Sequence, residues 1–225
     1  FYNAAIWADQ IIFWSVDGVG SYVRFHPLYD TCKFLAYASV IPALALMIVR
    51  VETSFYECYR AFYGSILRGF PLATIERRKQ AMLADLREST VRLLRVQGAA
   101  TLVMLLLAPT IIRVLGLGEA AVDILRACSL AAFFHVMLLI VILVQLYFDL
   151  RKSALWTSLT FLVTNALFAL WSFDAGVTTY GLGYAAAAIL SLCLAYVLLV
   201  RSYEKLEVLT FTQPPVEIDP VMEPV

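Results

Sequence analysis

The feature that most constrains this chain is a series of apolar runs, each close to the length that crosses a bilayer. A transmembrane helix needs about 20 predominantly apolar residues. Six segments meet this condition, each bounded by charge, Gly or Pro: 1–17, 34–51, 96–115, 127–148, 154–173 and 182–200. Backbone groups in lipid must be satisfied within the segment, and the ten-residue alternation of barrel strands is missing, so these runs predict helices. The first run begins at residue 1, and we expect its start to be clipped.

Composition supports a membrane setting. Of 225 residues, 62% are apolar and 15% are charged, whereas a soluble domain carries about a quarter charged and just under half apolar residues. A soluble fold must still cover itself with polar surface, so this excess has nowhere to be buried. The predicted fold class is an all-α, polytopic membrane helix bundle.

The distribution of basic residues predicts the orientation of the bundle. Cytoplasmic loops carry an excess of Lys and Arg, and the 17 basic residues divide thirteen to four between alternate sides of the six segments. The basic side holds the linker 52–95, the turn 149–153 and the C-terminus, which we therefore expect in the cytoplasm. Loops 18–33, 116–126 and 174–181 are expected outside. Residues 212–225 are rich in Pro and acid and predict a disordered tail.

The first segment carries the densest intramembrane polarity. Asn3, Trp7, Gln10 and Trp14 recur at three- and four-residue steps and share a helical face, and Asp9 lies about 100° from Gln10. An ionisable residue within a span is by default a functional hypothesis, and Trp beside polar groups suits a surface for sugar rings. The alternative is that Trp14 anchors the segment at the interface and Asp9 or Asp17 lies at headgroup depth.

The stretch VETSFYECYRAFYGSI, at 51–66, leaves the second segment with aromatic side chains threaded between charges. An aromatic belt at the headgroups explains this composition. A docking helix for a partner protein is the second interpretation, and its predicted contacts are Glu52, Tyr56, Glu57, Tyr59 and Arg60. Residues 71–95 have helical apolar spacing with a basic opposite face, typical of an interfacial or cytoplasmic helix beside anionic headgroups.

Motifs for covalent chemistry are scarce. The four cysteines form no CxxC pair or metal-like cluster, and no Walker loop, Ser/His/Asp set or HExxH spacing appears, so we predict no cofactor, metal or catalytic site. No base-reading or phosphate-cradling pattern appears either, and no nucleic-acid partner is expected. Two functional interpretations stay open at this point: a structural scaffold subunit, and a membrane acyltransferase built around His135.

Several of these segments together resemble the C-terminal half of the PelG family, membrane proteins of bacterial Pel exopolysaccharide systems. The resemblance rests on WADQIIFW (7–14), FHPLYDTCKFLAY (25–37), VRVETSFYECYRAFYGSI (49–66), LLRVQG (93–98), LYFDLRKSAL (146–155), TYGLGYA (179–185) and YEKLEVLTF (203–211). It spans nearly the whole chain apart from the tail. The family often carries Trp-x-Asp-Lys in the first of these segments; this chain has Gln10 at the last position, which argues against a charged pair with Asp9.

The resemblance implies one six-helix lobe of a twelve-span transporter, similar to the multidrug/oligosaccharidyl-lipid/polysaccharide flippases. In that fold the first helix of each lobe lines a central cavity, which implies cavity positions for Asn3, Trp7, Asp9, Gln10 and Trp14. The implied activity is non-enzymatic export of a cationic amino-sugar polymer across the bacterial inner membrane. The implied partners are a cytosolic glycosyltransferase and other inner-membrane Pel subunits.

Overall fold

The computed structural model describes residues 1–22 and 24–203, without the side chains of Val51, Glu52 and Tyr203. The predicted tail 212–225 and most of the YEKLEVLTF segment lie outside the described residues. Within them every regular element is helical, apart from an isolated bridge between Val19 and Phe25. The helices are α1 (Tyr2–Asp17), α2 (Pro27–Ala38), α3 (Ile41–Val49), η1 (Arg50–Phe55), α4 (Tyr56–Leu67), α5 (Leu72–Val114), α6 (Ala120–Tyr147), α7 (Arg151–Ala175), η2 (Val177–Thr179) and α8 (Leu182–Tyr203).

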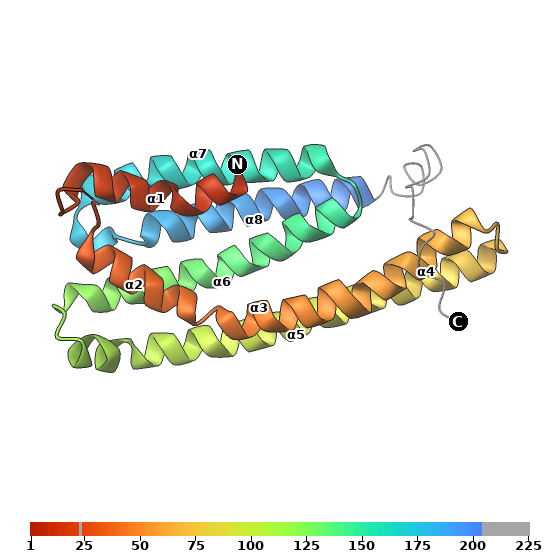
Figure 1. The fold of residues 1–225 in the computed structure, drawn as a ribbon, viewed down its shortest axis with the longest axis horizontal. Coiled ribbons are helices and arrows are strands. Elements are labelled where there is room, and N and C mark those ends of the chain that lie inside the picture. Colours follow the sequence, from red (N-terminus) through yellow and green to blue (C-terminus); the bar gives the residue numbers. More distant parts are fainter. Residues whose placement is uncertain (23, 204–225) are drawn as a thin grey trace.

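The predicted all-helical membrane bundle is confirmed. Among the described residues, five helical stretches are long and apolar enough to cross a membrane: Pro27–Leu67, Leu72–Val114, Ala120–Tyr147, Arg151–Ala175 and Val177–Ser202. The remaining long element, α1, has 16 residues and would span about 24 Å at the rise of an α-helix. It lies alongside α7 in the same bundle (Figure 1).

The helices are arranged around α6, which packs against α2, α5 and α8. The fully buried side chains of α6 include Ile124, Leu125 and Leu138. Helix α7 packs mainly against α1 and α8. The α7–α8 contact is close because small residues occupy it: a Cβ added at Gly183 would lie 2.3 Å from the carbonyl oxygen of Phe168. Small residues at a contact let membrane helices approach one another this closely.

The second helical stretch begins earlier than the apolar run indicates. Instead of starting at residue 34, it starts at Pro27, where the His26 Nδ1 accepts a hydrogen bond of 3.2 Å from the Tyr29 amide. Proline is well suited to the first turn because its missing N–H has no helical partner there. Lys33, expected in an outer loop, therefore lies inside a helix.

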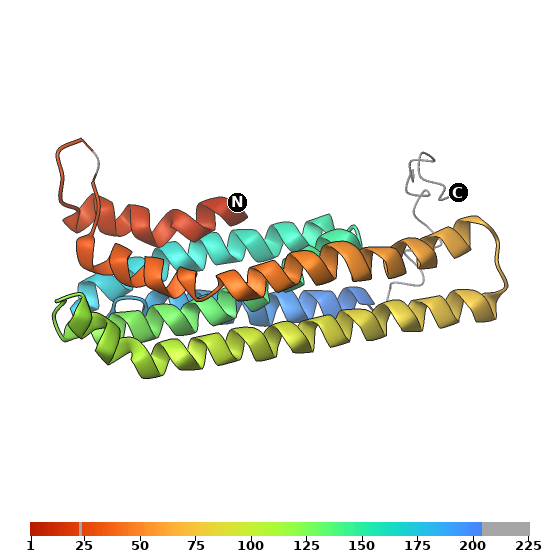
Figure 2. The same cartoon turned by 60° about the horizontal axis from the view of Figure 1, so that its bottom comes forward.

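This same stretch is bent twice before it ends. The helix is interrupted between α2 and α3, just before Pro42, and again by the π-helical η1. Proline and π-helical turns are both established causes of helix kinks. Beyond η1, α4 and the first half of the 43-residue α5 form a hairpin that extends past the ends of α6 to α8 (Figure 2).

Candidate functional site

The inner face of α1 places a carboxylate in the middle of the bundle. Ala5, Ala8, Asp9 and Phe13 are its buried residues, and Asp9 is 1% exposed. Small alanines on this face let α1 approach α7 closely. Asp9 therefore points into the packed interior of this bundle.

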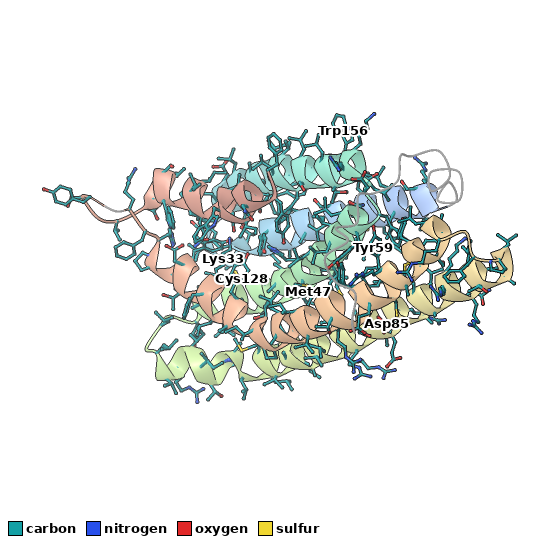
Figure 3. The ribbon with its side chains drawn as sticks, turned by 45° about the vertical axis from the view of Figure 1, so that its right-hand side comes forward. Lys33, Met47, Tyr59, Asp85, Cys128 and Trp156 are labelled. Carbon is teal, nitrogen blue, oxygen red and sulfur yellow. The ribbon has the colours of Figure 1, made fainter. Side chains whose placement is uncertain are left out.

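The partner of Asp9 is Lys33 on α2. Its Nζ lies 2.7 Å from Asp9 Oδ1 and 2.8 Å from Oδ2, and it also donates to the Ile6 carbonyl oxygen at 2.9 Å. Lys33 is also 1% exposed, and Figure 3 shows it between the helices, near Cys128. The three donors of the ammonium thus have acceptors without any need for water.

Two further groups complete the hydrogen bonding of the carboxylate. The Tyr29 hydroxyl donates to Asp9 Oδ2, and Asn165 Nδ2 donates to Oδ1 at 3.2 Å and to the Ala5 carbonyl oxygen at 2.8 Å. The cluster of Asp9, Tyr29, Lys33 and Asn165, which we call the Asp9–Lys33 cluster, thereby joins α1, α2 and α7. A buried ion pair offsets its desolvation only when such additional hydrogen bonds are present.

A layer of aromatic polar side chains lies directly beside this cluster. Lys33 Nζ is 4.7 Å from the centroid of the Tyr184 ring, a cation–π distance. The Tyr184 hydroxyl contacts Tyr37 at 2.8 Å and also His135 Nδ1, while Tyr2 contacts His135 Nε2 at 2.6 Å. His135, the residue on which the acyltransferase alternative depends, therefore faces three phenols, and no carboxylate or serine among the described residues hydrogen-bonds to it.

The outer face of α1 has a different character. Asn3 is exposed, Trp7 is 50% exposed, and Gln10 and Trp14 are half-buried. The two indole rings lie 6.3 Å apart between centroids. Asp30 fixes one end of this face, because it accepts from Gln10 Nε2 at 3.1 Å and from Trp14 Nε1 at 2.7 Å.

The predicted cavity residues therefore separate into two groups. Asn3, Trp7, Gln10 and Trp14 share the outer face of α1, and Asn3 also lines an apolar groove of about 430 Å³ between α6 and α7. Asp9 lies on the opposite, inner side. The argument from Gln10 against a charged pair with Asp9 was wrong: the cation is Lys33, 24 residues away rather than one.

Sequence reasoning missed Lys33 and Tyr29. One signal was available: Tyr29, Lys33 and Tyr37 follow one another at four-residue steps after the His26–Pro27 start, so they share a helical face. An amide within an apolar run, such as Asn165, commonly hydrogen-bonds between helices, but nothing local indicates Asp9 as its partner.

The residues predicted for partner docking lie at and beyond the second bend. Tyr56 and Glu57 are exposed and Tyr59 and Arg60 are half-buried, while the side chain of Glu52 lies outside the described part of the chain. Tyr59 contacts the ring of Tyr147 on α6 at 5.8 Å (centroids; both helices in Figure 1).

The π-helical turn itself is tied to α5. The Ser54 hydroxyl donates to Asp85 Oδ1 at 2.8 Å, and Phe55 is fully buried beside it. Tyr56 and Glu57, at the start of α4, therefore directly follow a turn whose inner side is anchored to α5.

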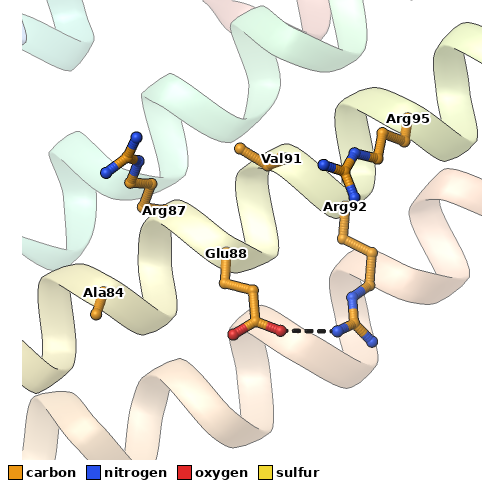
Figure 4. Close-up of a pocket in the computed structure, with 6 residues that line it drawn as sticks. All are labelled: Ala84, Arg87, Glu88, Val91, Arg92 and Arg95. Carbon is orange, nitrogen blue, oxygen red and sulfur yellow. Dashed lines mark hydrogen bonds and ion pairs between the residues drawn. The ribbon is translucent and has the colours of Figure 1, made fainter.

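A basic groove lies on α5, on the N-terminal side of the apolar part of this helix. It has a volume of about 450 Å³, and one helix supplies its lining: Ala84, Arg87, Glu88, Val91, Arg92 and Arg95 (Figure 4). Arg92 pairs with Glu88 at 2.7 Å, whereas Arg87 and Arg95 have no ion-pair partner among the described residues. Arg95 and Arg113 bracket the uncharged part of α5 over about 27 Å, close to the hydrocarbon thickness of about 30 Å.

The described residues contain no group of three His, Cys, Asp or Glu side chains that could hold a metal ion. Cys32, Cys58, Cys128 and Cys193 are free. The Asp9–Lys33 cluster can hold helices in place by charge. The outer face of α1 presents both apolar and polar side chains.

The long apolar helices define the class of the molecule, a multi-span helical membrane protein. They enclose a buried ion pair whose charged groups are all hydrogen-bonded. Over residues 1–211 the chain matches the family described as "PelG: Putative exopolysaccharide Exporter (EPS-E)". The chain belongs to this family, and the resemblance drawn from the sequence motifs is confirmed. No significant match was found among curated proteins or among solved structures.

Membership of this family gives the broad class of function of the chain. The family is one of exopolysaccharide exporters and not of enzymes, so a polysaccharide is its substrate class and a membrane its setting.

Proposed function

We propose that this chain forms one lobe of a transporter that moves a Pel-like, cationic amino-sugar polymer across the bacterial inner membrane. In this proposal the outer face of α1 lines the path of the polymer, and the lobe works by alternating access against a second helical lobe. Its partners are a cytosolic glycosyltransferase and other inner-membrane Pel subunits.

The observation that carries the proposal is the division of α1 into two faces. An isolated polar residue in a span is commonly used to join helices, and Asp9 is used in this way. Within the described residues no side chain of α6, α7 or α8 hydrogen-bonds to the outer face, which holds two indoles and two amide side chains. A face of that composition suits sugar rings, which offer flat apolar surfaces edged by hydroxyls.

Charge on this side of the bundle fits a cationic polymer. Asp17, at the end of α1, has a side chain 69% exposed, and Asp30 lies beside Gln10 and Trp14. Carboxylates at the mouth of a low-dielectric path raise the local concentration of cations. Asp9 does not contribute in this way because Lys33 neutralises it.

The distribution of basic residues supports this orientation in the inner membrane. With the linker 52–95 and the C-terminus in the cytoplasm, the groove of Arg87, Arg92 and Arg95 lies at headgroup depth, where arginine favours anionic lipid. The α4–α5 hairpin then projects into the cytoplasm, and Tyr56, Glu57, Tyr59 and Arg60 are available, together with Glu52, for the cytosolic synthase.

The experiment compares two exposed tryptophans. Trp7→Ala removes a ring from the outer face of α1, whereas Trp156→Ala removes one from α7 that is 60% exposed (Figure 3). Secreted polymer is measured in cells with equal amounts of each variant in the membrane. We expect a severalfold loss for Trp7→Ala and little change for Trp156→Ala.

The scaffold alternative makes the opposite prediction. If secretion depends on the protein but is indifferent to Trp7→Ala and Gln10→Ala at normal protein levels, the α1 face does not line the path. Equal losses from Trp7→Ala and Trp156→Ala would mean that general packing, not a polymer contact, explains the effect.

A further inference from the structure

The Asp9–Lys33 cluster has the ligand set of a cation site. The ammonium of Lys33 is surrounded by both oxygens of one carboxylate and by the Ile6 carbonyl oxygen, at 2.7–2.9 Å. Carboxylate and carbonyl oxygens are the ligands that hard metal cations take in proteins. Here a side chain of the protein supplies the positive charge that these oxygens surround.

Asn165, whose amide nitrogen contacts the carboxylate, also has an oxygen that is not used within the described residues. Asn165 is fully buried, and its Oδ1 has no hydrogen-bond partner among the described residues. Nδ2 of the same amide lies 3.2 Å from Asp9 Oδ1. A buried amide oxygen without a donor is uncommon in folded proteins, and this one belongs to the side chain whose Nδ2 contacts Asp9.

The other neighbours also favour a cation. The faces of Tyr184 and Tyr37 lie 4.7 Å and 5.7 Å from Lys33 Nζ, and the face of an aromatic ring attracts positive charge. Among the described residues, Lys33 is the one Lys or Arg side chain that pairs with Asp9. If it is removed, a buried carboxylate is left that must be neutralised by a proton or by another cation.

We propose that Lys33 is a tethered cation occupying an oxygen-lined cation pocket, and that its truncation turns the pocket into a site for Na⁺. The wild-type bundle then needs no soluble cation at this position. This inference goes beyond the proposed export function and does not depend on the identity of the polymer.

The test measures thermal unfolding of the purified full-length protein in detergent, in NaCl and in choline chloride of equal ionic strength. Wild type is expected to unfold at the same temperature in both salts. Lys33→Ala leaves room for an ion, and we expect it to unfold at a temperature at least about 2 °C higher in NaCl, saturably with concentration. The double variant Asp9→Asn/Lys33→Ala lacks the carboxylate and is expected to lose this response.

Lys33→Met is the matched control, because it removes the charge and keeps the pocket filled. It should be less stable than wild type and indifferent to Na⁺. A Lys33→Ala protein that responds equally to NaCl and choline chloride has a protonated Asp9 and overturns the proposal.

If the Lys33→Ala protein does not accumulate in cells, the comparison of the two salts on the wild-type protein still tests the proposal. A wild-type protein that NaCl stabilises relative to choline chloride would show that Lys33 does not occupy the cation position, and it would also overturn the proposal.

Discussion

Two ion pairs in this molecule have the same closest distance and very different surroundings. Lys33 and Asp9 approach to 2.7 Å with both side chains 1% exposed, and Arg92 and Glu88 approach to 2.7 Å with side chains 44% and 68% exposed. The first pair joins separate helices, whereas the second lies within one turn of α5. Distance alone therefore says little about what a charge pair does for the fold.

Desolvation explains the difference between the two pairs. An exposed pair within a helix contributes about 0.3–0.5 kcal/mol, because water solvates each charge nearly as well. A buried pair gains little over an apolar replacement of both residues, but removing one partner leaves an uncompensated charge. The Asp9–Lys33 cluster should therefore be sensitive to single substitutions, and the α5 pair should not.

The largest expected effect is that of Lys33→Ala in a medium without Na⁺. It leaves the Asp9 carboxylate buried without its cation, and breaking such a pair is expected to lower the free energy of unfolding by about 3–5 kcal/mol. Unfolding by a denaturing detergent, with helix content as the signal, measures this. A loss below about 1 kcal/mol would place the pair in the same class as Glu88 and Arg92.

A smaller effect is expected from Tyr29→Phe. The substitution keeps the ring, which stacks on Phe13 at 4.3 Å between centroids, and removes only the hydroxyl that donates to Asp9 Oδ2. A buried acceptor that loses its donor is expected to lower the free energy of unfolding by about 1–3 kcal/mol. Tyr196→Phe, at a tyrosine 62% exposed on α8, is the control and should change nothing measurable.

The smallest effect is expected from Glu88→Gln. It removes the charge partner of Arg92 at an exposed site, and the free energy of unfolding should change by at most about 0.5 kcal/mol. Added salt should reduce even that difference, because it screens exposed charges. A larger, salt-insensitive change would mean that the basic groove of α5 is covered in the native protein.

Much of this architecture could be predicted from the sequence. Apolar runs and their basic borders predict a helical membrane bundle, and helical periodicity places Trp7, Gln10 and Trp14 on one face with Asp9 turned away from it. These inferences depend on local spacing, which a helix translates directly into geometry.

The core of the candidate site could not be predicted in the same way. Lys33 stands just before an apolar run, where a cation is ordinarily read as the edge of the membrane, and only the start of α2 at Pro27 brings it inside. Its contacts with Asp9 and Asn165 join helices far apart in sequence, and no local pattern specifies such a pairing. The bend at η1 likewise depends on packing against α5.

A double-mutant cycle tests the central claim that Asp9 and Lys33 act as one unit in the bundle core. The free energy of unfolding is measured for wild type, Asp9→Ala, Lys33→Ala and the double variant, again without Na⁺, and in parallel for the corresponding Glu88 and Arg92 variants. We predict a coupling energy of about 2–3 kcal/mol for the buried pair and at most about 0.5 kcal/mol for the exposed pair. Additive effects of Asp9→Ala and Lys33→Ala, or equal coupling energies for the two pairs, would contradict the claim.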